Sequence, residues 1–197
     1  MSTIVAVRKN GKACIAADTL TTFGDCRQAA DMDADSEKIL SFEESYLGIV
    51  GSAAHHLVVQ SALRKLKQAD FSSRPAVFET LCELHPLLKE NYFLNPKDEE
   101  DDAYESTHID SLLVNETGIY GIYALREVFE YTTYWAPGAG AEFALGAMYA
   151  VYDKLESAEE IAKVGIEAGA KFNTDTALPM TLYSVDLAAK KPETILI

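Results

Sequence analysis

The sequence predicts an α+β fold in a single domain spanning residues 1–197. Strands rich in β-branched residues begin at the N-terminus, two pairs of amphipathic helices interrupt the strands, and the chain returns to a strand near its end. Two groups of strands and two helical pairs are compatible with a four-layer αββα sandwich, in which each sheet packs one face on the other sheet and one on helices. A hydrophobic content of 48% in 197 residues supplies enough material for its core.

The first strand is expected at residues 4–7, where β-branched side chains gather. Asn10-Gly11 is a strong hairpin signal, so the chain should return at once as residues 14–17. Removal of Met1 would expose Ser2, with a hydroxyl and an amine on one residue. An α-amine with an ordinary pKa of about 7.7 to 8.0 can serve as the base for such a hydroxyl. Ser is common at the second position, so position alone does not separate catalysis from a plain N-terminal strand.

The rest of the first half alternates a loop, a strand pair and a helix pair. Residues 18–34 form a long loop with a short extended piece, and strands are expected at 38–42 and 46–50. Apolar residues then recur at helical intervals in two helices, one opening at Ser52 and one in which Pro86 should produce a kink. The recurring residues are His56, Val59, Leu63 and Leu66 in the first helix and Val77, Leu81, Leu84 and Leu88 in the second.

The second half repeats this order after an acidic insert. The run Asp98-Glu99-Glu100-Asp101-Asp102 cannot be buried together and should face solvent. Strands are expected at 109–114, 119–124 and 127–131, followed by a helix over 141–153. A capping box from Ser157 to Glu160 opens the last helix, and residues 180–187 form the last strand.

Composition excludes several classes of function. The net charge of −14, from 31 acidic and 17 basic residues, is opposite to what nucleic acid requires. No apolar run approaches the roughly 18 residues of a membrane span, and no basic leader precedes an apolar stretch, so a cytoplasmic protein without membrane contact is expected.

Metal and cofactor motifs are also missing from the sequence. The three cysteines and four histidines show no metal-ligand spacing, so no metal is expected. Gly138-Ala139-Gly140 is similar to half of a dinucleotide fingerprint, but Phe143 stands where the third glycine is needed, so no cofactor is expected. An internal-serine hydrolase is a further alternative, but no Gly-x-Ser-x-Gly motif occurs.

The start of the chain resembles the bacterial proteasome-like peptidase HslV. The resemblance rests on Thr3-Ile4-Val5-Ala6-Val7-Arg8, Asn10-Gly11 and Ile15-Ala16-Ala17-Asp18. Downstream, three segments follow in the order that proteasome β-subunits use, namely Lys38-Ile39-Leu40, Gly48-Ile49-Val50-Gly51 and Gly138-Ala139-Gly140. The Ser in place of Thr and the acidic insert make the chain most similar to the betaproteobacterial proteasome homologues, or BPH.

This resemblance implies the N-terminal nucleophile (Ntn) hydrolase fold of proteasome subunits, which is a four-layer αββα sandwich, and an endopeptidase activity. It implies Ser2 as the nucleophile, with Asp18 and Lys38 as its catalytic partners and Gly48 as the oxyanion-hole donor. The remaining positions that it implies are the active-site neighbours Ala139 and Asp175 and the substrate-binding residues Leu20, Thr22, Tyr46 and Val50.

The resemblance also implies an assembly and a substrate class. The expected substrate is a peptide or unfolded protein, and the expected particle is a homo-oligomeric double ring of fourteen or twelve subunits, as in the family. Whether an unfoldase assists the peptidase stays open. The alternative is a catalytically idle ring that binds or scaffolds proteins, because Ala139 stands where many members have Ser and because Ser2 replaces Thr.

Overall fold

The computed structural model describes residues 2–94, 107 and 109–189, so the acidic run at 98–102 lies outside the described residues. The helices and strands are β1 (Ile4–Lys9), β2 (Lys12–Asp18), β3 (Thr21–Phe23), β4 (Cys26–Gln28), the 3₁₀ turn η1 (Ala30–Met32), β5 (Ile39–Phe42), β6 (Ser45–Val50), α1 (Ala53–Leu63), α2 (Arg74–Tyr92), β7 (Asp110–Asn115), β8 (Gly118–Tyr123), β9 (Glu127–Tyr131), β10 (Tyr134–Trp135), α3 (Ala141–Val151), α4 (Ala158–Phe172) and β11 (Met180–Asp186).

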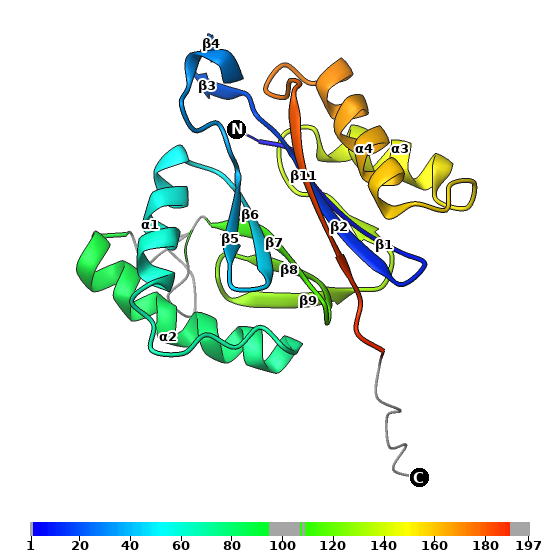
Figure 1. Cartoon of the computed structure of the whole chain (residues 1–197). Coiled ribbons are helices and arrows are strands. Elements are labelled where there is room, and N and C mark those ends of the chain that lie inside the picture. Colours follow the sequence, from blue (N-terminus) through cyan, green and yellow to red (C-terminus); the bar gives the residue numbers. More distant parts are fainter. Residues whose placement is uncertain (1, 95–106, 108, 190–197) are drawn as a thin grey trace.

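Two antiparallel sheets pack face to face between two pairs of helices (Figure 1). One sheet has the strand order β10-β1-β2-β11 and carries α3 and α4 on its outer face, while the other has the order β5-β6-β7-β8-β9 and carries α1 and α2. The layers therefore run helices, sheet, sheet, helices. This confirms the predicted α+β, four-layer αββα sandwich.

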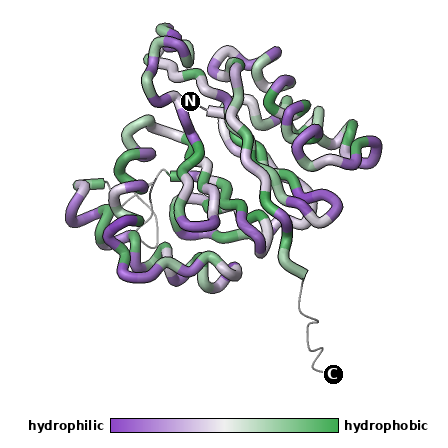
Figure 2. Tube along the Cα trace, in the orientation of Figure 1, coloured by the Kyte–Doolittle hydropathy of each residue, from purple (hydrophilic) through white to green (hydrophobic). Residues whose placement is uncertain are grey.

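Three apolar clusters hold the layers together. One lies between α1, α2 and the five-stranded sheet, a second between the four-stranded sheet and α3 and α4, and a third between the two sheets. Figure 2 shows the hydrophobic residues concentrated along the strands in the middle of the molecule. Each fully buried Val, Leu or Ile contributes about 1.5 to 3 kcal/mol of transfer free energy, so these clusters stabilise the packing of the layers.

The first hairpin positions the N-terminus. Asn10 and Gly11 have φ values of 49° and 78°, which is the left-handed pair that a type I′ turn needs, and the register runs from Ile4 opposite Ala17 to Lys9 opposite Lys12. β1 also pairs with β10, so it is an interior strand whose residues from Ile4 to Val7 are fully buried. Because β1 is held on both sides, the position of Ser2, two residues before this strand, is also restricted.

Serine caps begin three of the helices. The Oγ atoms of Ser52, Ser73 and Ser157 accept hydrogen bonds from the first turns of α1, α2 and α4. Pro86 lies inside α2, which is one continuous helix from Arg74 to Tyr92. No helix in the described part of the chain is both long enough and apolar enough to cross a membrane.

Candidate active site

The main chain at Ser2 is clamped between β2 and the loop that leads into α3. The Ser2 carbonyl accepts a hydrogen bond from Ala139 N at 2.8 Å, and the Thr3 carbonyl accepts one from Asp18 N at 3.2 Å. Gly138, at φ 103°, approaches so closely that a Cβ there would overlap the Ser2 carbonyl. Only glycine fits this contact, so the Gly138 loop fixes Ser2, whose exposed fraction is 7%.

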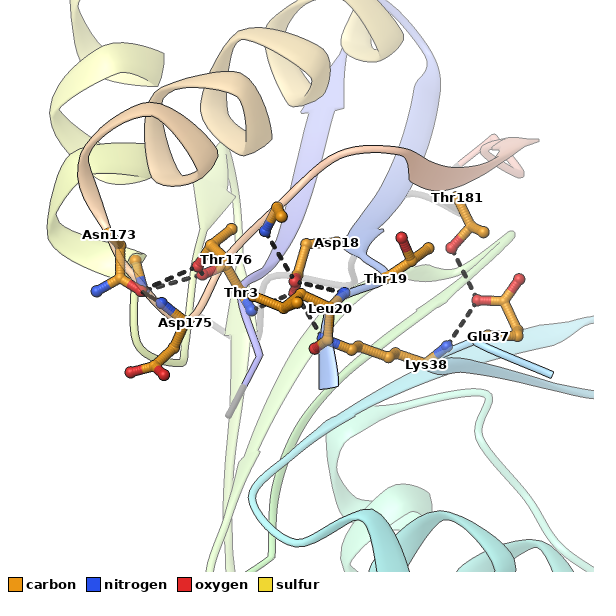
Figure 3. A network of polar contacts seen from close by, with 12 residues as sticks. Thr3, Asp18, Thr19, Leu20, Glu37, Lys38, Asn173, Asp175, Thr176 and Thr181 are labelled. Carbon is orange, nitrogen blue, oxygen red and sulfur yellow. Dashed lines mark hydrogen bonds and ion pairs between the residues drawn. The ribbon is translucent and has the colours of Figure 1, made fainter. Parts of the chain in front are cut away.

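Asp18 is the central acceptor of the site. Its exposed fraction is 0%, and its Oδ1 accepts from Thr3 N at 2.8 Å and from Lys38 Nζ at 2.9 Å (Figure 3). Its Oδ2 accepts from Leu20 N at 3.1 Å and Ala177 N at 3.3 Å. A buried carboxylate with four such donors has the partners that a buried charge requires, so Asp18 is rigidly oriented beside the peptide that joins Ser2 to Thr3.

Lys38 reaches this carboxylate from the other sheet. Its side chain is 11% exposed, and Nζ also donates to the Leu20 carbonyl at 2.6 Å. Burial lowers the pKa of Lys38 below its ordinary value, and the charge and hydrogen bond of Asp18 oppose that shift. The structure thus brings the predicted pair Asp18 and Lys38 together, next to the amide of Thr3.

A second polar network, which the sequence did not reveal, holds Ala139 in place. Asn173 Nδ2 donates to the Ala139 carbonyl at 2.9 Å, and Thr176 Oγ1 donates to Asn173 Oδ1 at 3.2 Å. Thr176 Oγ1 also lies 2.6 Å from Thr3 Oγ1, which accepts from Gly140 N at 2.9 Å. Ala139 therefore contributes through its backbone to the positioning of Ser2.

In the sequence, the residue that could indicate this network is Asn173, directly after α4. Asn173 accepts from Asp175 N at 2.9 Å, which is the local turn that asparagine typically makes with the residue two positions on. Asp175 was the polar partner implied by the resemblance, but its carboxylate points away from Asp18 and Lys38 (Figure 3). The buried polar side chain of this segment is Thr176.

The structure places Gly48 inside the sheet sandwich, whereas the resemblance implied an oxyanion-hole donor at this residue. Gly48 pairs with Ile39 on β5 and with Leu112 on β7, and a Cβ there would lie 2.8 Å from Ile4 Cγ2. An amide in the interior of a sheet is engaged in its ladder, so Gly48 is a packing position. Gly51 follows the last residue of β6, is exposed and has φ 116°.

The four residues predicted to bind substrate fall into two groups. Val50 lies beside the Gly138 loop, Leu20 contacts both Asp18 and Lys38, and Thr22 lies on β3, two residues beyond Leu20. Tyr46 is at the opposite end of β6 from Val50, roughly 13 Å away along an extended strand, and stacks on Tyr183 with ring centroids 4.7 Å apart. The structure therefore places Leu20 and Val50 next to residues of the site, Thr22 on the nearby strand β3, and Tyr46 at the far end of β6.

Comparisons with known proteins identify the fold and the family. No protein-family model matches the chain, and neither does any curated protein. Two solved structures of Thiobacillus denitrificans BPH, one of them in complex with epoxomicin, are similar with TM-scores of 0.88 and sequence identities of 37% and 36%, and each match covers 95% of this chain and 100% of the other.

A more distant match supports the same architecture. The crystal structure of eukaryotic HslV from Trypanosoma brucei superimposes with a TM-score of 0.70 at 17% identity, over 93% of this chain and 99% of the other, which shows the fold alone. Together with the αββα layers and the clamped N-terminal strand, the similarity to BPH shows that this chain belongs to the BPH family of HslV-like, proteasome-type peptidase subunits.

Proposed function

We propose that the chain, after loss of Met1, is an N-terminal nucleophile endopeptidase that uses Ser2. The Ser2 amine takes the hydroxyl proton, directly or through water, while Oγ bonds to the scissile carbonyl carbon. The bond from that carbon to the leaving nitrogen then breaks, and the amine returns the proton to this nitrogen. Water cleaves the resulting ester by the same route and regenerates Ser2.

The observation that carries this proposal is the shared oxygen of Asp18. Because Oδ1 accepts from both Thr3 N and Lys38 Nζ, a cation is held next to the residue that follows Ser2. A nearby cation lowers the pKa of the Ser2 amine and so keeps it in the neutral form that can accept a proton.

The oxyanion donor that we propose is Gly51 in place of Gly48. Gly51 directly follows Val50, the last residue of β6, and the Val50 side chain lies against Gly138, which in turn contacts the Ser2 carbonyl. An exposed amide at this strand end is available to a substrate, whereas an amide inside the ladder is not.

We expect the substrate to bind as an extended peptide between β3 and the end of β6. Thr22 and the segment from Val50 to Gly51 offer backbone groups for strand addition, and Leu20 and Val50 would shape the first specificity pocket. Ala139 would act through its backbone, and we assign Asp175 a place at the rim of the site. No cofactor is needed for this chemistry, and we place the particle in the cytoplasm as a closed double ring of fourteen or twelve subunits, as in the family.

The variant Ser2→Ala tests the nucleophile. It should abolish peptide hydrolysis and labelling by a peptide epoxyketone, the class of reagent to which epoxomicin belongs, while its melting temperature stays that of the wild type. The mass of the purified chain must first show that Met1 is absent, because an acylated amine cannot act as a base.

Undiminished hydrolysis by Ser2→Ala would refute the proposal. If the processed wild-type chain assembles but neither cleaves peptides nor takes the reagent, the alternative of an idle ring that binds or scaffolds proteins is the correct one. Ala139, which lacks the polar side chain that many family members have at this position, is the observation that favours this alternative.

A further inference from the structure

The carboxylate of Glu37, one residue before Lys38, is bonded to both sheets. Its Oε1 accepts from Lys38 N and Ile39 N, each at 2.9 Å, and from Thr181 Oγ1 at 2.8 Å. Its Oε2 accepts from Tyr183 Oη at 2.9 Å. Figure 3 shows Glu37 between Lys38 and Thr181. Hydrogen bonds to an ionised acceptor are roughly twice as strong as neutral ones, so this is a firm attachment.

The attachment fixes the backbone from which the Lys38 side chain extends. β5 begins only at Ile39, so Lys38 lies just before the regular part of the strand. Its N–H is held by Glu37, and its carbonyl accepts from Ile49 N at 3.3 Å. A lysine side chain has four rotatable bonds and loses much rotamer freedom when it is immobilised. If the Lys38 backbone were displaced, its ammonium group would therefore be free to move away from Asp18.

The other end of the attachment lies on the strand that neighbours Asp18. β11 pairs with β2 so that Met180 is opposite Asp18, Thr181 opposite Ala17 and Tyr183 opposite Ile15. Asp18 is the last residue of β2 in one sheet, and Lys38 directly precedes β5 in the other. The hydrogen bonds of Glu37 to Ile39 and Thr181 are a second connection between these sheets near the same end. Tyr46 stacks on the Tyr183 ring and so helps to hold the Tyr183 hydroxyl, which donates a hydrogen bond to Glu37.

We infer that Glu37 is a positioning residue that holds the Lys38 ammonium against Asp18 and thereby sets the acylation rate at Ser2. The inference rests on the proposed function of the same site. Glu37 acts through hydrogen-bond geometry, because three of its four contacts are made by one oxygen that a glutamine carbonyl reproduces, and a glutamine NH₂ can donate to Tyr183 Oη.

The first test compares Glu37→Ala with Glu37→Gln in the processed, assembled protein. The readouts are the maximal inactivation rate and the half-saturating concentration for a small neutral peptide epoxyketone. In Glu37→Ala the maximal rate should fall roughly 10- to 100-fold, as expected for a misplaced catalytic group, with the half-saturating concentration unchanged. Glu37→Gln should restore most of the rate. Glu44→Ala, an equal charge change at an exposed site in the turn between β5 and β6, is the matched control and should match the wild type.

The second test reads the position of Lys38 without any activity. Reductive methylation followed by mass spectrometry should leave Lys38 unmodified in the wild type, since its side chain is 11% exposed, and should modify it in Glu37→Ala at the rate of surface lysines. If Glu37→Ala does not fold, Thr181→Val and Tyr183→Phe, combined in one chain, remove two of the four bonds and should give the same result more weakly.

The outcomes separate the two proposals. A wild type that takes no epoxyketone refutes the nucleophile, while Lys38 that becomes reactive only in Glu37→Ala still supports the positioning. A protected Lys38 and an unchanged inactivation rate in Glu37→Ala would overturn the inference. It would also be overturned if Glu37→Gln lost as much rate as Glu37→Ala, because charge and not hydrogen-bond geometry would then be responsible.

Discussion

At the scale of single residues, the proposed chemistry requires opposite protonation states of two amino groups. The Ser2 amine must be neutral to accept the hydroxyl proton, and Lys38 must be cationic to be held by Asp18 and to lower the amine pKa. Burial disfavours the charged form of Lys38 and lowers its pKa, although Asp18 opposes this effect. The Ser2 amine therefore sets the lower limit of the pH range in which the enzyme is active, and Lys38 sets the upper limit.

The acylation rate should accordingly show a bell-shaped dependence on pH. It should rise with pH as the Ser2 amine deprotonates, at or below the ordinary pKa of about 7.7 to 8.0. It should fall again as Lys38 loses its proton, at a pKa below the ordinary 10.5. The measurement is kcat/KM for a neutral peptide against pH. In Lys38→Arg, whose guanidinium keeps its charge, the alkaline decline should vanish from whatever activity remains. A wild-type rate still level above the ordinary lysine pKa would contradict the role of Lys38.

Single residues also show what the sequence could predict about the site. Asp18 and Lys38 were predicted because each stands beside a strand whose residues follow the family order, and the structure joins them. Asn173, Thr176 and Glu37 were not predicted, because the contacts that give them a role join residues 34, 173 and 144 positions apart in the chain. Contacts of this kind appear only once both sheets are placed.

At the scale of elements, β6 explains why Gly48 and Gly51 differ. Side chains alternate along a strand, so Leu47 and Ile49 face α1 and α2, while Gly48 and Val50 face the other sheet. At Gly48 the opposing sheet leaves no room, since Ile4 and Ile15 occupy the space that a Cβ would need. Order along the chain cannot show which glycine of a strand lies in a ladder and which lies at its end.

Gly48→Ala should therefore destabilise the protein without directly changing the chemistry. The added methyl would lie 2.8 Å from Ile4 Cγ2, and overpacking of this kind costs about 1 to 3 kcal/mol of unfolding free energy. The control is Gly146→Ala within α3, where nothing lies near the new methyl, and it should be neutral or stabilising by up to about 1 kcal/mol. Denaturant unfolding measures both changes. Equal stability of Gly48→Ala and the wild type would contradict the packing role.

The elements that escaped the sequence prediction are the short ones. β3, β4 and β10 have two or three residues each, too few for an alternating pattern to be recognised. The longer strands were predicted to within a few residues, and the hairpin at Asn10 and Gly11 was predicted from its turn residues alone. The helix α2 continues for six residues beyond Pro86, and the kink expected there stays a prediction.

At the scale of the whole molecule, exposed aromatic side chains gather on the α3 and α4 layer and on β10. Trp135 is 37% exposed, Phe143 41%, Phe172 68% and Tyr149 80%, and Phe143 and Phe172 contact each other. Large exposed apolar side chains of this kind mark surfaces that other proteins cover. We therefore expect this layer to contribute to the contacts of a larger particle.

Light scattering of the processed protein should give a particle of roughly twelve to fourteen subunits, as expected from the family and from repeated contacts that close into rings. Replacing Tyr149 and Phe172 by Ser should shift the particle toward smaller species if these side chains lie at the contacts, with Phe23→Ser, an exposed aromatic on β3, as the control. A stable monomer of the unaltered chain at micromolar concentration would contradict the assembly.

At this scale the fold was predictable for two reasons. The order of strands and helices is compatible with αββα layers, and the resemblance to the family implies this arrangement. Of the site, the contact between Asp18 and Lys38 was predictable, because both residues follow the family order beside strands. The position of Gly48 between the two sheets was not, because packing across the sheets leaves no mark in the order of residues.

The central claim is that the hydroxyl and the amine of Ser2 act together. The most direct test is the structure and mass of the adduct that a peptide epoxyketone forms with the processed chain. Such a reagent closes a ring through both groups, so we predict one adduct for each active subunit, with two new bonds from Ser2, one from Oγ and one from its nitrogen. An adduct on any other residue, or none at all on a chain whose Met1 has been removed, would contradict the claim.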